Sequence, residues 1–259
     1  MKLKSLFTAA ITAGLLVLSA PASAILTNWF IDTDGPGANN PKVLVKSYLD
    51  LNGIAYVHNT FSNPANFTFN EVASFITNLA DSTTSLAPLL TSKFVGTGSG
   101  IVGGNLVFNP GGTLDVFSGV LNIAHFNLQA GSANLFANTV LPNGAVSFIF
   151  KSTFMRAGYF FDSAMNDLSP IANSPTGVVL GFATTNALPL TINVDPTLIT
   201  AYNGAFSSPV PAVITPNGTT DLFLSNNGQF RLQVPEPSML SLLGLALLGM
   251  GVVSRRRKS

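Results

Sequence analysis

The stretch Ala-Val-Ser-Phe-Ile-Phe at residues 145–150 indicates most directly how this chain folds. In an extended strand, successive side chains point to opposite faces, so Val146, Phe148 and Phe150 share one face. The Ser and Ile between them share the other face, and Lys151 follows, so that face is partly solvated. This alternation predicts a β-strand with one buried face.

The composition around this stretch extends the same interpretation to the rest of the chain. It is rich in Phe, Val, Thr, Asn and Gly and poor in Glu, Lys and Arg, which favours strands and tight turns. Strands are expected at residues 54–61, 93–97, 105–108, 113–117, 145–154, 178–184 and 229–234. Asn-Gly pairs predict hairpin turns, and they occur at 52–53, 143–144, 203–204, 217–218 and 227–228.

Two segments carry a helical pattern. Residues 41–51 begin with a proline and space Leu44, Tyr48 and Leu51 at helical intervals. Residues 70–80 offer an N-cap asparagine and an apolar stripe. The expected fold is therefore mainly β: an antiparallel β-sandwich or a jelly-roll-like domain with one or two short helices.

Charge and cysteine content exclude several classes of function. Residues 25–234 hold six Lys and Arg against ten Asp and Glu, a net charge of −4, whereas the whole 259-residue chain has +1. A mildly acidic body gives no reason to expect a nucleic acid partner. The chain has no cysteine, which excludes disulfides and thiolate chemistry.

The N-terminus has the three parts of a Sec-type signal peptide. Lys2 and Lys4 precede an apolar segment at residues 6–18, and Ala22 and Ala24 form an A-x-A cleavage site. Cleavage is expected before Ile25, so residues 1–24 are assigned to the signal peptide.

The C-terminus has an equally ordered pattern. A Pro-Glu-Pro triplet precedes an uncharged apolar run at residues 239–253, and a basic cluster follows. As a helix the run would be about 22 Å long, a thin membrane span with its basic end in the cytoplasm. A buried helix of a globular domain is the alternative, and the terminal cations argue against it. The triplet and the basic cluster are Pro235, Glu236, Pro237, Arg255, Arg256, Arg257 and Lys258.

This arrangement resembles the PEP-CTERM sorting domain of Gram-negative bacteria, carried by residues 234–259. The resemblance implies processing near the triplet by an exosortase, a membrane protease-transpeptidase. It further implies final residence at the cell surface or in the extracellular matrix. Together with the signal peptide and the apolar run, this predicts Sec export and transient anchoring in the inner membrane through the C-terminal helix. Residues 25–233 are then one β-rich extracellular domain.

Segments of this body also resemble the flocculation-associated PEP-CTERM proteins of floc-forming bacteria. The resemblance implies a non-enzymatic matrix protein that helps cells aggregate with exopolysaccharide. The segments that carry it are residues 28–32, 46–50, 94–98, 157–162, 181–186 and 224–231.

Two motifs suggest ligand sites at first sight. Residues 98–103 match G-x-G-x-x-G, but a dinucleotide site needs a following helix, and the sequence after them is β-rich. Asp32 and Asp34 resemble the start of a calcium loop, although Pro36 and Val43 occupy later ligand positions of an EF-hand. A looser calcium site with Asn39 or Asn40 is one hypothesis, and an Asx-rich turn is the other.

Signs of catalysis are weak. His58 and His125 are too few for a zinc site without thiolates, and His58 is interpreted as structural. Phenylalanine richness points to a core, which leaves Trp29 and Tyr159 as the aromatic residues considered for sugar contact. The leading hypothesis is a surface or matrix protein that meets exopolysaccharide and has strand edges for self-association. The alternative is a secreted enzyme on matrix polysaccharide, with Asp115, Asp162 and Asp167 as candidate carboxylates.

Overall fold

The structure, a computed structural model, describes residues 23–38, 40–189, 195–206 and 218–235. The chain divides into two compact units. One spans Ile25–Val234, and the other joins residues 1–24 to residues 235–259 and lies almost wholly outside the described residues. The first unit is described below.

The described residues form thirteen strands and two helices. The helices are α2 (Ser169–Ala172) and α3 (Pro196–Ala205). The strands are β1 (Ser23–Ile25), β2 (Trp29–Ile31), β3 (Val43–Val45), β4 (Leu49–Phe61), β5 (Asn66–Ala80), β6 (Thr84–Ile101), β7 (Asn105–Phe108), β8 (Thr113–Ser118), β9 (Leu121–Leu135), β10 (Pro142–Met155), β11 (Phe160–Phe161), β12 (Val179–Pro189) and β13 (Asp221–Pro235).

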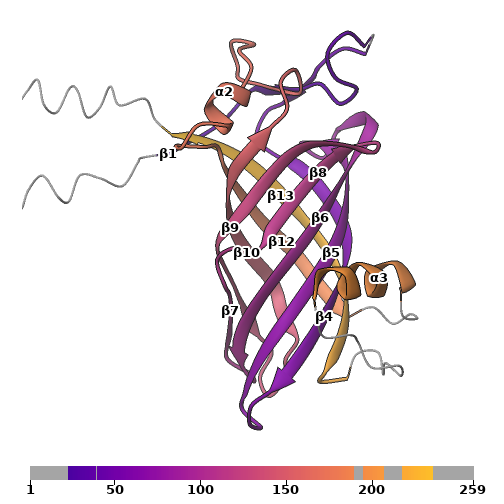
Figure 1. The fold of residues 1–259 in the computed structure, drawn as a ribbon, viewed down its shortest axis with the longest axis vertical. Coiled ribbons are helices and arrows are strands. Elements are labelled where there is room, and N and C mark those ends of the chain that lie inside the picture. Colours follow the sequence, from indigo (N-terminus) through magenta and orange to yellow (C-terminus); the bar gives the residue numbers. More distant parts are fainter. Residues whose placement is uncertain (1–22, 39, 190–194, 207–217, 236–259) are drawn as a thin grey trace, which may run out of the picture. The chain divides into compact units, whose positions relative to one another are not determined.

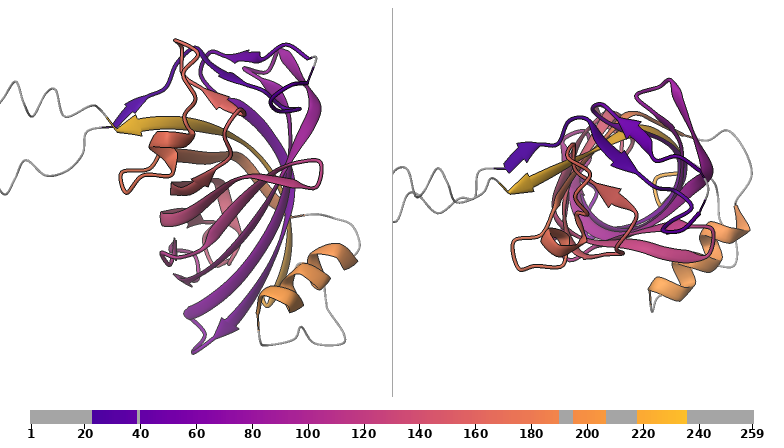
Figure 2. Two further views of the ribbon diagram at one scale, coloured as in Figure 1. Left: turned by 45° about the horizontal axis from the view of Figure 1, so that its top comes forward. Right: turned by 90° about the horizontal axis from the view of Figure 1, so that it is seen from above.

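Ten of the strands form one sheet that closes on itself. Its order is β1-β13-β12-β10-β9-β7-β6-β5-β4, with β8 between β6 and β9. β13 also pairs with β4, antiparallel, with Leu222 opposite Val57, and this seam completes the ring. Figure 1 shows the strands side by side, and the view from above in Figure 2 shows them around one interior. A second sheet, β11-β2-β3, has three strands.

The predicted fold class is confirmed: the described residues are mainly antiparallel β-structure with two short helices. Six of the seven expected strands lie within observed ones, and the seventh, residues 178–184, starts one residue before β12. Opposite walls face each other over a shared core, as the layers of a sandwich do. Here those walls belong to one continuous closed sheet.

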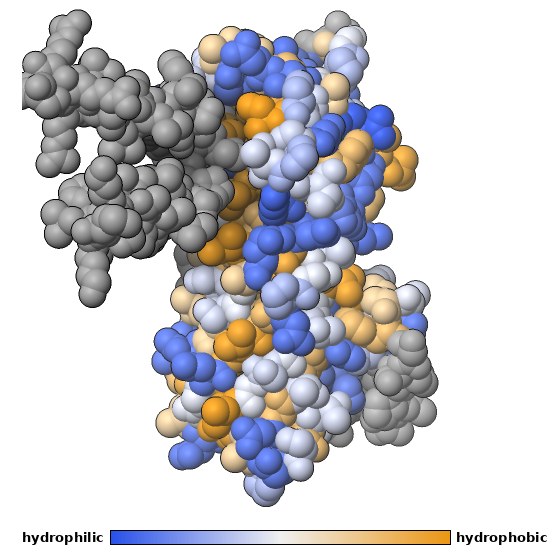
Figure 3. Space-filling model, turned by 60° about the vertical axis from the view of Figure 1, so that its left-hand side comes forward, coloured by the Kyte–Doolittle hydropathy of each residue, from blue (hydrophilic) through white to orange (hydrophobic). Residues whose placement is uncertain are grey.

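Phenylalanine rings fill much of the interior. Phe108 lies 4.6 Å from Phe148 and 4.9 Å from Phe69 between ring centroids, and Phe94 lies 5.3 Å from Phe148. Such offset and edge-to-face pairs add to the free energy gained by burying the rings. The face shown in Figure 3 mixes hydrophilic residues with scattered hydrophobic ones. The alternation seen in residues 145–150 therefore separates this aromatic core from the outer surface.

Glycines on β6 make room for these rings. Gly98 stands opposite Phe69 on β5 and Phe108 on β7. A Cβ atom at Gly98 would lie 2.3 Å from Cζ of Phe69. The G-x-G-x-x-G letters at residues 98–103 thus belong to the end of a strand and the turn after it, and β7 follows them.

Both predicted helix positions are wrong. Residues 41–51 contain β3 and the start of β4, and residues 70–80 lie within β5. In β5 the apolar stripe divides between two faces: Phe75 points into the core, whereas Ile76 is 47% exposed. The helical spacing was a coincidence in a strand whose inner face is continuous.

The described Asn-Gly pairs do not form the predicted hairpin turns. The pairs at 52–53 and 227–228 lie inside β4 and β13, where Asn227 is opposite Asn52. The pair at 143–144 lies in β10 beside a register shift, and the pair at 203–204 lies in α3. Asn217 is outside the described residues. Other loops reverse the chain, including residues 62–65 between β4 and β5 and residues 81–83 between β5 and β6.

No helix in the described part of the chain is long and apolar enough to cross a membrane. The apolar run at residues 239–253, predicted to do so, lies outside that part. The same holds for the apolar segment of the signal peptide.

Candidate functional site

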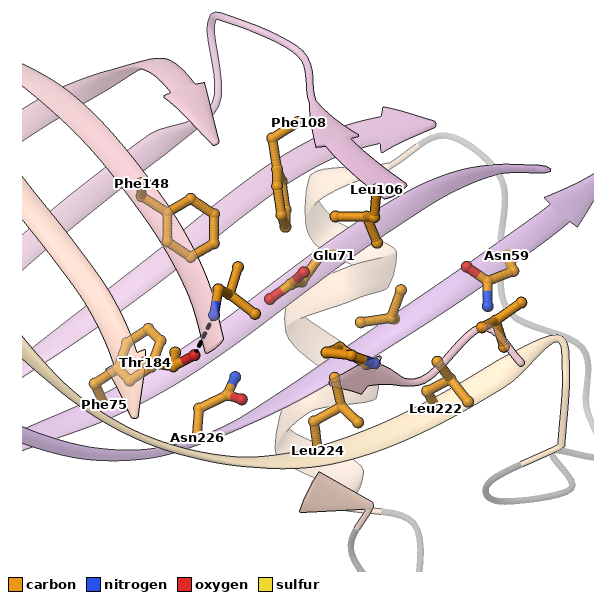
Figure 4. Close-up of a pocket in the computed structure, with 14 residues that line it drawn as sticks. Asn59, Glu71, Phe75, Leu106, Phe108, Phe148, Thr184, Leu222, Leu224 and Asn226 are labelled. Atoms are coloured by element: carbon orange, nitrogen blue, oxygen red, sulfur yellow. Dashed lines mark hydrogen bonds between the residues drawn. The ribbon is translucent and has the colours of Figure 1, made fainter. Parts of the chain in front are cut away.

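A carboxyl group is buried inside the closed sheet. Glu71 on β5 points inward among Phe108, Phe148 and Leu106 (Figure 4), and it is 7% exposed. Among the described residues it has no hydrogen-bond or ion-pair partner. Burial raises the pKa of Glu71 to about 8, so the group is mostly uncharged at neutral pH.

Two amide groups line the same cavity. Asn59 on β4 donates from Nδ2 to the Thr219 carbonyl at 2.8 Å, while its Oδ1 has no partner. Oδ1 of Asn226 on β13 also has none. The cavity holds about 20 Å³, which is room for a water-sized group. The cavity is too small for a sugar or a dinucleotide. Its polar side chains are therefore expected to affect the stability of the fold rather than to bind such a ligand.

A second polar cluster lies outside the sheet, beneath α3. Asp221 accepts a hydrogen bond from Tyr56 Oη at 2.6 Å and lies 2.8 Å from Nδ1 of His58. Tyr202 of α3 packs edge-on against Tyr56, and its hydroxyl accepts from Asn70 at 3.2 Å. Burial and the bond to Asp221 raise the pKa of Tyr56. These contacts tie α3 to β4 and β5, and through Tyr56 to β13, which fits the interpretation of His58 as structural.

The other histidine makes a separate pair on the outer surface. Nδ1 of His125 lies 2.7 Å from Oδ1 of Asp115, which also accepts from Asn122 at 2.7 Å. Each histidine thus has its own aspartate. Among the described residues there is no group of three or more His, Cys, Asp or Glu placed to hold a metal ion.

The remaining candidate catalytic carboxylates accept hydrogen bonds from the backbone of their own loops. Asp162 accepts hydrogen bonds from the backbone of Ala164 and Asn166, both at 2.8 Å. Asp167 accepts from the backbone of Gly158 and Ser169. With Asp115 paired to His125, each of the three carboxylates has a local partner, so this geometry adds no support to a glycosidase dyad.

The candidate calcium ligands lie in the loop after β2. Oδ1 of Asp32 accepts from the Gly35 backbone at 3.0 Å, and Oδ2 of Asp34 accepts from the Asn40 backbone at 3.4 Å. Burial and the neighbouring Asp34 raise the pKa of Asp32. These are features of the Asx-rich turn, while the calcium hypothesis stays a prediction. Asn39 is outside the described residues.

The aromatic residues considered for sugar contact are not exposed. Trp29 is fully buried and Tyr159 is 5% exposed. Exposed rings are found instead among the phenylalanines: Phe154 is 37% exposed. The sequence interpretation of phenylalanine as core missed these positions.

Two grooves lie on either side of the loop that contains Pro36. The first, of about 600 Å³, is lined by Phe30, Phe161 and Lys42 among others. The second, of about 550 Å³, is lined by Phe154 and Arg156 among others. Pro36 borders both. Volumes of this size suit small ligands or short polymer segments.

The processing signal lies at the other end of the sequence. β13 ends at Pro235, and Glu236 and Pro237 are outside the described residues. Residues 233–258 match the sequence model of the PEP-CTERM protein-sorting motif. The chain carries a PEP-CTERM sorting motif. No curated protein and no solved structure matches the chain.

The PEP-CTERM motif shows that the protein is exported, processed by an exosortase, and held at the membrane by its C-terminal segment before processing. Its destination is the cell surface.

Proposed function

We propose that this protein is a non-enzymatic surface or matrix protein that supports floc or biofilm formation together with exopolysaccharide. The observation that carries the proposal is the PEP-CTERM motif at residues 233–258. Export by Sec from a Gram-negative cell completes the proposed route, and the signal peptide pattern at residues 1–24 supports it.

The described domain is suited to a polymer partner. Its grooves are open to solvent and combine phenylalanine rings with cations, carboxylates and amides. Its interior, by contrast, has room only for a water-sized group. A polysaccharide is therefore expected to contact the outer surface.

Self-association through strand edges would use the small sheet rather than the seam of the large one. β13 and β4 pair with each other and close the large sheet over that seam, and paired strands offer no edge to a second molecule. The short sheet β11-β2-β3 keeps β3 at its edge.

Deletion of the gene in its native host tests the proposed function. We expect flocs to be lost while exopolysaccharide synthesis stays intact, and a plasmid copy of the wild-type gene to restore them. Normal flocs in the deletion strain would contradict the proposal. Reduced exopolysaccharide would instead indicate a role in polymer synthesis.

A further inference from the structure

The two grooves beside Pro36 repeat one chemical arrangement. In the first, Nζ of Lys42 lies 4.2 Å from the ring centroid of Phe161. In the second, Cζ of Arg156 lies 5.8 Å from the ring centroid of Phe154. Each groove thus combines a phenylalanine ring with a cation positioned over it. Because Pro36 borders both, a linear ligand could run from one groove into the next.

The charges of these two cations are not neutralised by an ion pair. Among the described residues, the close contacts between a basic and an acidic side chain are the two His–Asp contacts, and neither includes Lys42 or Arg156. Nε of Arg156 donates to the Asn122 carbonyl at 3.2 Å, which leaves its other N–H groups to donate elsewhere. A cation near an aromatic face keeps its attraction for a carboxylate that approaches from the open side.

Each groove also contains an aspartate, whose charge would oppose an anion. Asp32 Oδ1 and Asp34 Oδ2 both accept hydrogen bonds from backbone N–H groups, which partly offset the negative charge of each carboxylate. Asp32 lines the first groove and is 9% exposed. Burial and Asp34 raise the pKa of Asp32, while the charge of Lys42 acts in the opposite direction. Lys42 and Arg156 are therefore the groups best able to select the charge of a ligand.

Apolar groups supply the rest of the contact surface. Phe30 stands opposite Phe161 in the small sheet, and Met165 beside them is 46% exposed. Leu121 in the second groove is 39% exposed. The C–H faces of sugar rings pack on such surfaces, while their hydroxyl groups bond to polar neighbours such as Asn40 and Asn173.

We propose that the two grooves form one binding track for an acidic polysaccharide, a polymer whose sugar units carry carboxylates. This rests on the proposed function, and it specifies the polymer class and the residues that contact it. Carboxylates bind Lys42 and Arg156, and sugar rings pack beside Phe161 and Phe154. The body has a net charge of −4, but its acids include the buried Asp32, Glu71 and Asp221. At 0.1 M salt, charges more than about 10 Å away are largely screened. The attraction of a ligand carboxylate to Lys42 and Arg156 therefore outweighs repulsion by distant acids.

Binding of the full-length protein, purified in detergent, to alginate tests the proposal, with neutral dextran of matched length as the comparison. Alginate is a polymer of uronate sugars and serves as the acidic probe. We expect alginate to bind more tightly than dextran. Lys42→Ala combined with Arg156→Ala should weaken alginate binding about tenfold, as expected for two partly exposed charged contacts.

The matched control is Lys93→Ala combined with Arg231→Ala. These cations also lie over aromatic rings, each at 5.6 Å from the centroid, and removing them lowers the net charge equally. Neither lines a groove. The control should change binding less than twofold, and thermal melts of both variants verify folding.

Equal loss in both double variants would show general charge attraction and overturn the assigned track. Equal binding of dextran and alginate, or no binding of alginate, would overturn the acidic polymer class. Each of these results can occur with loss of flocs on gene deletion, so failure of the track is distinguishable from failure of the proposed function.

Discussion

Glu71 is a carboxyl group with no partner inside an apolar, closed sheet. Burying an ionised carboxylate is costly, and the group responds by holding its proton: its pKa is raised to about 8. In the unfolded chain the same group ionises near pH 4.5. Unfolding therefore releases a proton over the range between these two values.

Glu71→Gln should raise the stability of the protein at neutral pH. Below pH 4.5 the folded and the unfolded wild type both hold the proton, so Glu71 costs no stability. As pH rises toward about 8, only the unfolded state releases the proton, so the free energy of unfolding falls. The slope is about 1.4 kcal/mol per pH unit, which amounts to about 3 kcal/mol at pH 7. Glutamine cannot ionise and removes this dependence. Thermal melts of both proteins between pH 4 and 9 measure it, and parallel curves would contradict the account.

Gly98→Ala should destabilise the protein, because the new methyl group would meet Phe69 and the Val107 carbonyl at 2.3 Å. Overpacking of a filled core costs about 1–3 kcal/mol. Gly204→Ala is the matched control, since a Cβ there has no neighbour within 4 Å and lies in α3. Alanine in a helix should leave stability unchanged or raise it by up to about 1 kcal/mol. Urea unfolding compares the two, and equal effects would contradict the packing of glycine against phenylalanine.

At the scale of single residues, the sequence predicted much of the inner face. Alternation marked Val146, Phe148 and Phe150 correctly as buried. It did not reveal Glu71 as an inward residue, because a lone acid in a strand is ordinarily on the solvated face. Nor did it show that Phe154 is exposed, since exposure depends on which strands and loops surround it.

Among the elements, α3 begins with a clear capping arrangement. Asp195 Oδ1 accepts the Thr197 backbone N–H at 2.7 Å, and Pro196 occupies the first turn. The Thr197 hydroxyl also donates to it, and these bonds hold the pKa of Asp195 below its usual value. An Asp-Pro pair before Leu198 was a signal that could have located this helix from the sequence.

Asp195→Ala should loosen α3 from the strands below it. Loss of an N-cap costs about 1 kcal/mol. We expect faster hydrogen exchange in residues 196–205, with the core strands unchanged, because the Phe-rich interior lies on the other side of β4 and β5. Asp195→Asn keeps an acceptor and should retain most of the protection. Uniformly faster exchange across the sheet would contradict a local role for the cap.

The strands were predicted better than the helices for a physical reason. An alternating inner face is repeated along each strand, so short apolar patterns sufficed for β7 and β10. In β5 an amphipathic helix fitted the same letters, and only pairing with β4 and β6 decided between them. Tertiary pairing of this kind is not encoded in a single local segment.

For the whole molecule, closure of the sheet could not be predicted from local patterns. The pairs at Asn52-Gly53 and Asn227-Gly228 looked like turns, yet they pair with each other across the seam between β4 and β13. Gly53 lies against the Phe75 side chain, and Gly228 lies against the backbone of Ala183. Close packing across strands, rather than chain reversal, accounts for these glycines.

Pro235→Ala combined with Pro237→Ala should block processing by the exosortase while leaving the domain folded. Both prolines lie within the sorting motif at residues 233–258, and Pro235 is the last residue of β13, two residues beyond Gln233, where the pairing with β12 ends. The precursor should accumulate in the membrane fraction with a wild-type melting temperature. Unchanged release of the mature domain would show that the triplet is not the processing signal.

Sorting to the matrix is the central claim, and mass spectrometry of the protein from native biomass tests it most directly. Cell-bound and matrix fractions are analysed separately. A mature chain that starts at Ile25 and ends near Pro237, found in the matrix, is the predicted result. A chain that retains residues 239–259 in the inner membrane would contradict it, and the closed sheet would then be a periplasmic domain held by its tail.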